Sequence, residues 1–370
     1  MTNKDGTTPA PVDRRGFFKT AGAGVAAAGL MLTPGEAAQN VTQVFSEKER
    51  LNRLASNSYP LRWLFKSRAG GRGGGGRGGQ MSQQMKEKYG EITMLDFPQF
   101  TKDTFQGVVH MDIWSSLFGD VTDETMFSQQ GRGFDPGSAS GKKWLDQMAS
   151  RLVKTGTHVH HISNNAPTGM SGPEEDARKA GIDVAKKWLD AAATLGAKSM
   201  RVNSGGPNIL PQSANGPDGY PKNDAIVPYL RACIESFKEM ADYGAERNVK
   251  VTLENHWGLT ANPMNIRIII EGVNHPYCEA SPDFGNWEHE YLLFSGLKDV
   301  APYAHTTVHA KYWDRWATND VQRSTRIMLA SGFKGKFALE YEAGPWDGVE
   351  GCKYLYKEVL AALSTPSPVI

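Results

Sequence analysis

The sequence has little cysteine, almost no net charge and no long apolar run, and each shortage excludes a class of protein. Its three cysteines, Cys233, Cys278 and Cys352, are too few and too widely spaced for a disulfide framework or a zinc-binding cysteine pair, so we expect small buried hydrophobic residues. Because 41 basic and 40 acidic residues nearly cancel, no overall basic field draws the 370-residue chain onto nucleic acid. No Gly-x-Gly-x-x-Gly turn lies directly after the first expected strand, which disfavours a dinucleotide-binding sheet.

The amino terminus is typical of an export signal. Residues 13–19 read Asp-Arg-Arg-Gly-Phe-Phe-Lys, and an apolar run rich in alanine and glycine follows from Thr20 to Leu32. Paired arginines before such a run indicate a twin-arginine signal. The run is shorter than the roughly 20 residues that a spanning helix needs, so we expect no stable membrane span. We predict a signal peptide over 1–38, an N-terminal segment over 39–53 and a periplasmic or otherwise exported protein.

From residue 54 onward, short β-branched or apolar runs alternate with longer segments of helical period. The expected strands are 55–61, 106–113, 157–163, 198–204, 249–255, 277–283, 304–310 and 335–341. The clearest helical segments are 173–195, 223–247 and 349–363. Such alternation is typical of parallel βα units, and eight repeats predict one (β/α)8 TIM barrel over 54–365. A doubly wound open sheet is the alternative fold.

A glycine-rich tract occupies residues 69–80. It contains too few side chains to offset the entropy cost of ordering it, so we predict a flexible loop. Because the tract follows the first strand, it leaves the end of the barrel where active-site loops gather. Two arginines on a neutral protein do not support the alternative of an RNA-binding tract.

Four polar residues end consecutive strands of the predicted barrel. Glu254, Asp283, His309 and Glu340 close the apolar runs of the fifth to eighth strands, at the end where barrel enzymes place their functional groups. Three carboxylates and an imidazole that converge would repel one another if left bare, but they form an oxygen-rich shell for a hard cation. We therefore predict one divalent metal ion, with Mn²⁺ preferred and Mg²⁺, Co²⁺ or Zn²⁺ as alternatives.

Other polar and aromatic residues fall near the same rim. Those that we expect to bind substrate are His160, His161, Asn203, His256, Lys311 and Trp313. Strand alternation sends His158 and His160 to one side and His161 to the other, and a structural histidine is the alternative for His160 and His161. Lys311 is placed to bind a substrate oxyanion. The tryptophans near this rim suit the apolar faces of sugar rings.

The motifs Leu-Glu-Asn-His-Trp-Gly, Pro-Asp-Phe-Gly-Asn, Val-His-Ala-Lys and Leu-Glu-Tyr-Glu resemble those of the sugar phosphate isomerase/epimerase family, the xylose isomerase-like barrels that include ketose 3-epimerases. The resemblance covers about residues 54–363. It implies that Glu254, Asp283, His309 and Glu340 are metal ligands, and that Glu254 and Glu340 are also the acid/base pair.

The chain also departs from its relatives. Asn286 stands where ketose 3-epimerases carry a histidine, and Arg315 lies in a tryptophan-rich context. Endonuclease IV, a related three-zinc enzyme, needs further His and Asp ligands that this chain does not supply. These departures turn attention to enzymes of the family other than free-ketose epimerases.

The chemistry favours an isomerase or epimerase that removes a proton next to a carbonyl through a metal-stabilised enediolate. A hydratase or lyase that acts on 3-keto-glycosides with the same metal site is the second hypothesis, and a non-catalytic periplasmic sugar-binding protein is the third. The expected partners are a small carbohydrate or glycoside and the twin-arginine export machinery, but not nucleic acid. Homo-oligomerisation is left open.

Overall fold

The computed structural model describes residues 45–66, 77–128, 133–207 and 223–364, all within one compact unit. The predicted signal peptide and residues 69–76 of the glycine-rich tract lie outside the described residues. The domain boundaries predicted at 38 and 53 stay predictions.

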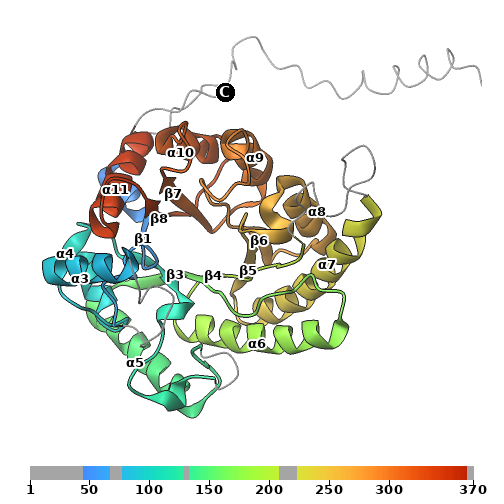
Figure 1. Cartoon of the computed structure of the whole chain (residues 1–370), viewed down its shortest axis with the longest axis horizontal. Coiled ribbons are helices and arrows are strands. Elements are labelled where there is room, and N and C mark those ends of the chain that lie inside the picture. Colours follow the sequence, from blue (N-terminus) through green and yellow to red (C-terminus); the bar gives the residue numbers. More distant parts are fainter. Residues whose placement is uncertain (1–44, 67–76, 129–132, 208–222, 365–370) are drawn as a thin grey trace, which may run out of the picture. The chain divides into compact units, whose positions relative to one another are not determined.

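Within the described residues, eight parallel strands form the centre of the molecule and helices surround them (Figure 1). The strands are β1 (Leu54–Asn57), β2 (His110–Trp114), β3 (His158–Ser163), β4 (Ser199–Arg201), β5 (Lys250–Leu253), β6 (Cys278–Ala280), β7 (Thr307–Trp313) and β8 (Lys336–Ala343). Their order is β6-β5-β4-β3-β2-β1-β8-β7, so the sheet curls until its two edges meet. The predicted (β/α)8 barrel is confirmed.

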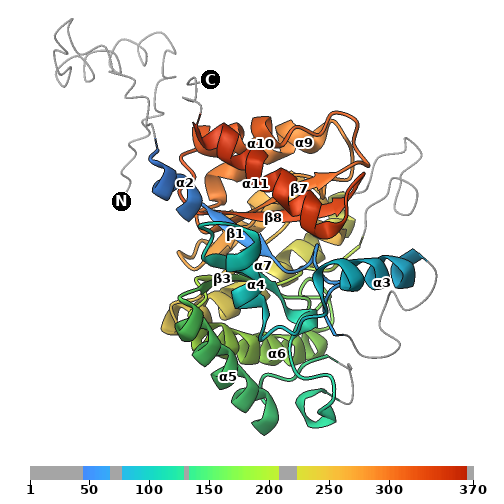
Figure 2. The same ribbon diagram turned by 90° about the vertical axis from the view of Figure 1, so that its left-hand side faces the viewer.

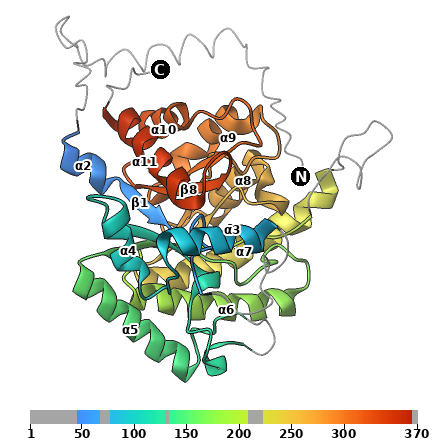
Figure 3. The ribbon, with the colours of Figure 1, turned by 60° about the vertical axis from the view of Figure 1, so that its left-hand side comes forward.

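The helices surround the strands, and most of them bury one face against the sheet. They are α2 (Glu47–Asn52), α3 (Arg77–Tyr89), α4 (Phe97–Thr104), α5 (Ala139–Thr155), α6 (Glu175–Thr194), α7 (Asn223–Glu246), α8 (Pro263–Val273), α9 (Leu292–Val300), α10 (Val321–Ala330) and α11 (Gly348–Ser364). The neighbours α4, α5 and α6 run along the outside of the barrel (Figure 3). Among the described residues, none of the helices is both long and apolar enough to cross a bilayer.

Helix α5 shows how the sequence specifies these elements. Its N-cap Ser138 accepts a hydrogen bond from the Gly141 N–H at 2.9 Å, and it ends at Gly156, whose left-handed φ of 66° suits glycine. Between these ends, apolar residues at helical spacing, including Trp144, Met148 and Leu152, are buried. All three cysteines are buried and unpaired, as expected.

The glycine-rich tract is not loop to its end. Residues 77–80 form the first turn of α3, whose Met85 is buried in the core and whose Ser82 hydroxyl donates to the Trp63 carbonyl. These tertiary contacts outweigh the poor helix propensity of glycine, and the prediction of a flexible loop is wrong for these four residues. Helices α2 and α3 lie at opposite ends of the barrel, with α3 at the end to which β1 leads (Figure 2).

The barrel closes between β6 and β7 through a short seam. An isolated parallel bridge joins Asp283 to His309. The His309 N–H donates to the Pro282 carbonyl at 2.9 Å, and the Phe284 N–H donates to the His309 carbonyl at 3.1 Å. Two of the predicted metal ligands are therefore paired by the backbone bonds that close the sheet.

A β-bulge in β3 overturns the predicted alternation of its histidines. Met111 pairs with Val159 but Asp112 pairs with His161, so His160 is an extra residue. Both histidines consequently reach toward β7 across the barrel, at different heights. The His160 Nε2 lies 3.0 Å from the carbonyl oxygen of Thr306, just before β7, whereas the His161 ring lies 5.6 Å from the His309 ring.

The loop after β5 holds a tryptophan in a strained conformation. Trp257 has φ 58° and ψ 171°, a backbone region that is almost confined to glycine and costs about 1–3 kcal/mol for other residues. The loop is fixed by the Leu259 N–H, which donates to the Gly205 carbonyl at 3.0 Å. At Gly258, an added Cβ would lie only 2.6 Å from that same carbonyl oxygen. The neighbouring loop thus holds this backbone in place.

This strain predicts an inverted order of stability at position 257. At ordinary positions a protein with alanine is more stable than the same protein with glycine by about 0.4–1 kcal/mol. At position 257 we expect the Trp257→Gly variant to melt at a higher temperature than the Trp257→Ala variant, because only glycine relieves the strain. Val153, 84% exposed in α5, is the matched control, where Val153→Ala should melt above Val153→Gly. Thermal melts of the four variants check this, and the same order at both positions would contradict it.

Candidate metal centre

The structure brings the four predicted metal ligands together inside the carboxyl end of the barrel. Glu254 directly follows β5, Asp283 lies at the seam after β6, and His309 and Glu340 lie within β7 and β8. All four side chains are buried. The His309 Nδ1 lies 3.2 Å from Glu254 Oε2 and 3.9 Å from Glu340 Oε2. Possible ligand atoms of Glu254, Asp283 and His309 all lie within 4.8 Å of one another.

Two atoms of this group indicate that it fits a cation. Within the described residues, His309 Nδ1 and Asp283 Oδ2 are buried but make no hydrogen bond. A carboxylate oxygen and an imidazole nitrogen 3.2 Å apart repel each other unless the nitrogen carries a proton or a metal ion lies nearby. Carboxylate oxygens and one imidazole nitrogen are ligands that suit Mn²⁺, Mg²⁺ or Co²⁺. The donor set thus fits the predicted divalent ion.

Asp112 in β2 fixes the orientation of His309. The Nε2 of His309 lies 2.9 Å from Asp112 Oδ2, and the Ser163 hydroxyl donates to Asp112 Oδ1 at 2.9 Å. A carboxylate bound to one ring nitrogen holds the proton there and leaves the other free as a ligand. Burial raises the pKa of Asp112, but His161, His309 and Ser163 lower it by more, so that the pKa lies below its usual value.

Asn57 joins Asp112 to the ligand set. Its Nδ2 lies 3.1 Å from both Asp112 Oδ2 and Glu340 Oε2. Sequence analysis assigned no role to either residue. The signal for Asp112 was a lone acid within the apolar run Val-Val-His-Met-Asp-Ile, whereas nothing local marked Asn57.

Buried charges of both signs set the protonation of the ligands. Arg201, the last residue of β4, donates to Glu254 Oε2 at 2.6 Å. Burial raises the pKa of Glu254, but Arg201 and His309 outweigh this and hold it well below its usual value. Burial raises the pKa of Asp283 to about 7, with the negative charges of Glu340 and Glu254 adding to the effect and Lys311 opposing it.

Lys311 lies within the ligand set rather than beside it. Its Nζ is 3.1 Å from Asp283 Oδ2, 3.0 Å from Glu340 Oε1 and 3.3 Å from Glu342 Oε2. Burial lowers its pKa, but these carboxylates raise it well above the usual value. Lys311 therefore shares Asp283 and Glu340 with any bound metal ion.

Asn286 links the two halves of the site. Its Nδ2 donates to Glu254 Oε1 and its Oδ1 accepts from Lys311 Nζ, both at 2.9 Å. An amide can donate and accept at once, which suits a position between a carboxylate and an ammonium group. Asn286 is thus a neutral bridge between Glu254 and Lys311.

The remaining predicted substrate residues are only partly brought together. The buried His161 lies beside Asp112 and His309, and its Nδ1 is 2.8 Å from the Ser199 hydroxyl oxygen. His256 and Asn203 follow β5 and β4 at the same end of the barrel, and burial lowers the pKa of His256 to about 4. Trp313 ends β7, with its ring centroid 5.9 Å from Lys311 Nζ. His160 does not join them, because its contact with Thr306 is near the amino-terminal ends of the strands.

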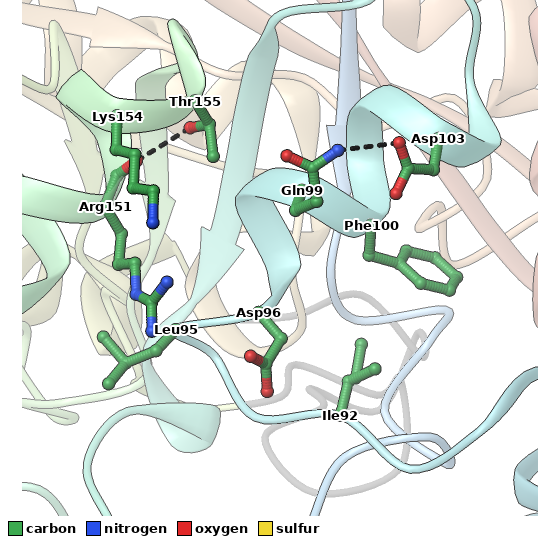
Figure 4. Close-up of a pocket in the computed structure, with 9 residues that line it drawn as sticks. All are labelled: Ile92, Leu95, Asp96, Gln99, Phe100, Asp103, Arg151, Lys154 and Thr155. Carbon is green, nitrogen blue, oxygen red and sulfur yellow. Dashed lines mark hydrogen bonds between the residues drawn. The ribbon is translucent and has the colours of Figure 1, made fainter.

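A separate cleft of about 480 Å³ lies on the outside of the barrel between α4 and α5 (Figure 4). Its lining combines apolar residues such as Leu95 and Phe100 with the charged Asp96, Asp103 and Arg151. None of the predicted site residues lines it. It therefore adds nothing to the candidate metal centre.

Solved structures similar to this chain share its fold. They include a 3-keto-D-glucoside 4-epimerase from E. coli, with 14% identity, a TM-score of 0.53 and coverage of 72% of this chain and 94% of that chain. A xylose isomerase-like TIM barrel protein from Mycobacterium smegmatis, in complex with magnesium, has 16% identity, a TM-score of 0.52 and coverage of 86% and 99%. An L-ribulose 3-epimerase has 12% identity, a TM-score of 0.55 and coverage of 84% and 94%. At such identities the likeness shows the fold alone.

The family comparison goes further. No curated protein matches the chain. The family described as xylose isomerase-like TIM barrel matches residues 125–358, more than half of the chain, and this segment contains all four predicted metal ligands. It confirms the resemblance seen in the sequence motifs. The chain belongs to the xylose isomerase-like TIM barrel family.

Proposed function

We propose that the protein is a divalent-metal-dependent carbohydrate isomerase or epimerase that removes a proton from a carbon next to a carbonyl. The observation that carries this proposal is the buried group of Glu254, Asp283, His309 and Glu340, whose carboxylates gather around one imidazole inside the barrel. Two structural neighbours, a 3-keto-D-glucoside 4-epimerase and an L-ribulose 3-epimerase, support epimerisation of a keto sugar.

We propose these four residues as the ligands of one metal ion, with Mn²⁺ preferred and Mg²⁺, Co²⁺ or Zn²⁺ as alternatives. A neighbour in complex with magnesium supports a divalent ion. When bound, such an ion supplies Lewis acidity, which polarises a sugar carbonyl and acidifies the adjacent C–H group.

Glu254 and Glu340 are the proposed acid/base pair. They come from β5 and β8, with β6 and β7 between them in the closed barrel, so they approach a sugar from different sides. Arg201 keeps Glu254 ionised and therefore able to accept a proton. Asn57 and Lys311 hold the two oxygens of Glu340, and Lys311 is placed to donate to a sugar oxygen.

Lys311 also favours a second candidate, a hydratase or lyase of 3-keto-glycosides. Elimination next to a carbonyl needs one group that takes a proton from carbon and another that protonates the departing oxygen. The carboxylate of Glu340 and the ammonium group of Lys311, 3.0 Å apart, supply both functions. A periplasmic sugar-binding protein is the third candidate, and it predicts no proton exchange.

Metal binding is the first test. We expect the full chain to bind one Mn²⁺ or Co²⁺, and Asp283→Ala and His309→Ala to lose it because each removes a ligand. Asp112→Asn should keep the stoichiometry but bind about 10–100 times more weakly, because the group that orients His309 is changed. Asp103→Asn, on α4 outside the barrel, is the control and should bind as the native chain does.

Calorimetry measures the affinities, and circular dichroism shows whether each variant still folds. Full metal binding by folded Asp283→Ala and His309→Ala proteins would refute the ligand assignment. Unchanged affinity in Asp112→Asn would refute only its positioning role.

Proton transfer is the second test. Glu254→Gln and Glu340→Gln keep the shape and an oxygen ligand but remove the proton acceptor, so we expect metal to be retained and turnover to fall about 10²- to 10⁴-fold. NMR in D₂O with free ketoses and 3-keto-glucosides measures deuterium entry into the substrate. Undiminished exchange in both variants would assign the base elsewhere, with Lys311 next in line. No exchange with any sugar in the metal-loaded native chain would favour the binding protein.

We also propose, from the amino-terminal residues alone, that the protein is exported to the periplasm by the twin-arginine machinery. The pair Arg14 and Arg15 lies outside the described residues. Replacing both by lysine should retain the protein in the cytoplasm because the export machinery reads this pair. Cell fractionation measures this, and an unchanged periplasmic share would contradict the proposal.

A further inference from the structure

Two tryptophans form an aromatic corner next to the charged residues of the site. Trp257 follows Glu254 by three residues, and Trp313 follows Lys311 by two. Their ring centroids are 6.5 Å apart with the planes at 89°, so the rings meet edge to face. Trp257 is 43% exposed, although a large aromatic side chain is normally buried. This pair is called the Trp257–Trp313 corner below.

The corner begins at the metal centre and extends away from it. The Nζ of Lys311 lies 5.9 Å from the Trp313 ring centroid and about half that distance from Asp283 and Glu340. The Trp257 ring centroid lies 6.5 Å from that of Trp313, and Trp257 is 43% exposed whereas the carboxylates are buried. A sugar ring held at the carboxylates therefore leaves the corner to a group attached to that ring.

Arg315 adds a polar partner to the corner. Its guanidinium carbon lies 4.3 Å from the Trp316 ring centroid, 5.0 Å from that of Trp313 and 5.8 Å from that of Trp257. The indole N–H of Trp316 donates to the Gly285 carbonyl at 2.9 Å, two residues after Asp283. Arg315 thus brings hydrogen-bond donors to the aromatic faces, and Trp316 connects it to the seam of the barrel.

Core packing does not account for Trp257. The residue retains its large exposed area in a backbone conformation that disfavours every residue with a Cβ atom. Such strained residues cluster at ligand sites, where the surrounding structure holds them. Flat aromatic surfaces stack on the C–H faces of sugars, and a guanidinium donates to hydroxyl groups.

We propose that the Trp257–Trp313 corner binds a second sugar ring attached to the reacting sugar, so that the substrates are disaccharides or larger glycosides rather than free monosaccharides. The inference rests on the proposed function, because it takes the carboxylate cluster as the place of the reacting ring. The first ring contacts the ligands and Lys311, and the second stacks on Trp257 and receives hydrogen bonds from Arg315.

The test compares probes that differ by one ring and need no proton transfer. Calorimetry on the metal-loaded full chain measures the affinity for methyl β-D-glucopyranoside against cellobiose, and for methyl α-D-glucopyranoside against maltose. In at least one pair, we expect the disaccharide to bind about tenfold more tightly, which is the size of one good stacking contact. Trp257→Ala should reduce this ratio to about one and leave the affinity for the methyl glycoside unchanged, whereas Trp257→Phe should restore most of it.

Trp346→Ala is the matched control. Trp346 is 39% exposed, but its ring contacts are with Tyr312, Tyr341 and Tyr354, so its removal should leave the ratio intact. Equal affinities within both pairs, failure of the native chain to bind either disaccharide, or a ratio that survives Trp257→Ala would overturn the proposal.

The outcome is separable from that of the proposed function. Glu254→Gln and Glu340→Gln should lose proton exchange and keep the disaccharide preference. A preference without proton exchange in the native chain supports the corner and rejects the isomerase. Proton exchange in free ketoses without a preference for disaccharides rejects the corner and supports the isomerase.

Discussion

Between β6 and β7 the sheet is closed by the two backbone hydrogen bonds of His309, to Pro282 and Phe284, and the geometry of the site depends on this seam. β6 is only three residues long, so Asp283 lies beyond it and needs other support. Asn255 provides this support from the loop after β5, accepting from the Asp283 N–H at 2.7 Å and donating to its carbonyl at 2.9 Å. The backbone bonds of the seam and the side chain of Asn255 together fix Glu254, Asp283 and His309 relative to one another.

Closing the barrel there buries several charges, and their compensation decides what the site does. An isolated buried carboxylate is very costly, so each acid must have a cation or donors. Arg201 forms an ion pair with Glu254, and Lys311 forms ion pairs with Asp283 and Glu340. The His309 ring has acidic residues on both sides. The same partners that make burial tolerable also set which oxygens are ionised and which atoms remain free for a ligand.

The sequence predicted the parts of this structure that local pattern determines. All eight strands and the three clearest helices were found because periodicity and flanking turns identify them. The four residues of the candidate metal centre could be named because each ends an apolar run. The predicted first strand was too long, since Asn57 accepts from the Tyr59 N–H and turns the chain. β7 and β8 extend past their predicted ends, since they pair through Trp313 and Ala343.

Relationships across the barrel were beyond the reach of local pattern. The sequence placed Lys311 near the rim but did not show that its ammonium group lies among the ligands, because that depends on the reach of a side chain across the barrel. The contacts of Asp112 and Asn57 with His309 and Glu340 could be seen only once β1 and β2 were placed beside β8 and His309. The directions in which His160 and His161 face were predicted wrongly for a different reason, since one inserted residue breaks the alternation on which the prediction depended.

That inserted residue divides β3 into two segments of opposite phase. Residues up to Val159 stay in step with the amino-terminal half of β2, and residues from His161 onward stay in step with Asp112 and Trp114. Because of the bulge, one strand supplies an inward-facing imidazole to two successive layers of the barrel interior. In the lower layer His160 contacts the Thr306 carbonyl, while in the upper layer His161 lies beside Asp112 and His309.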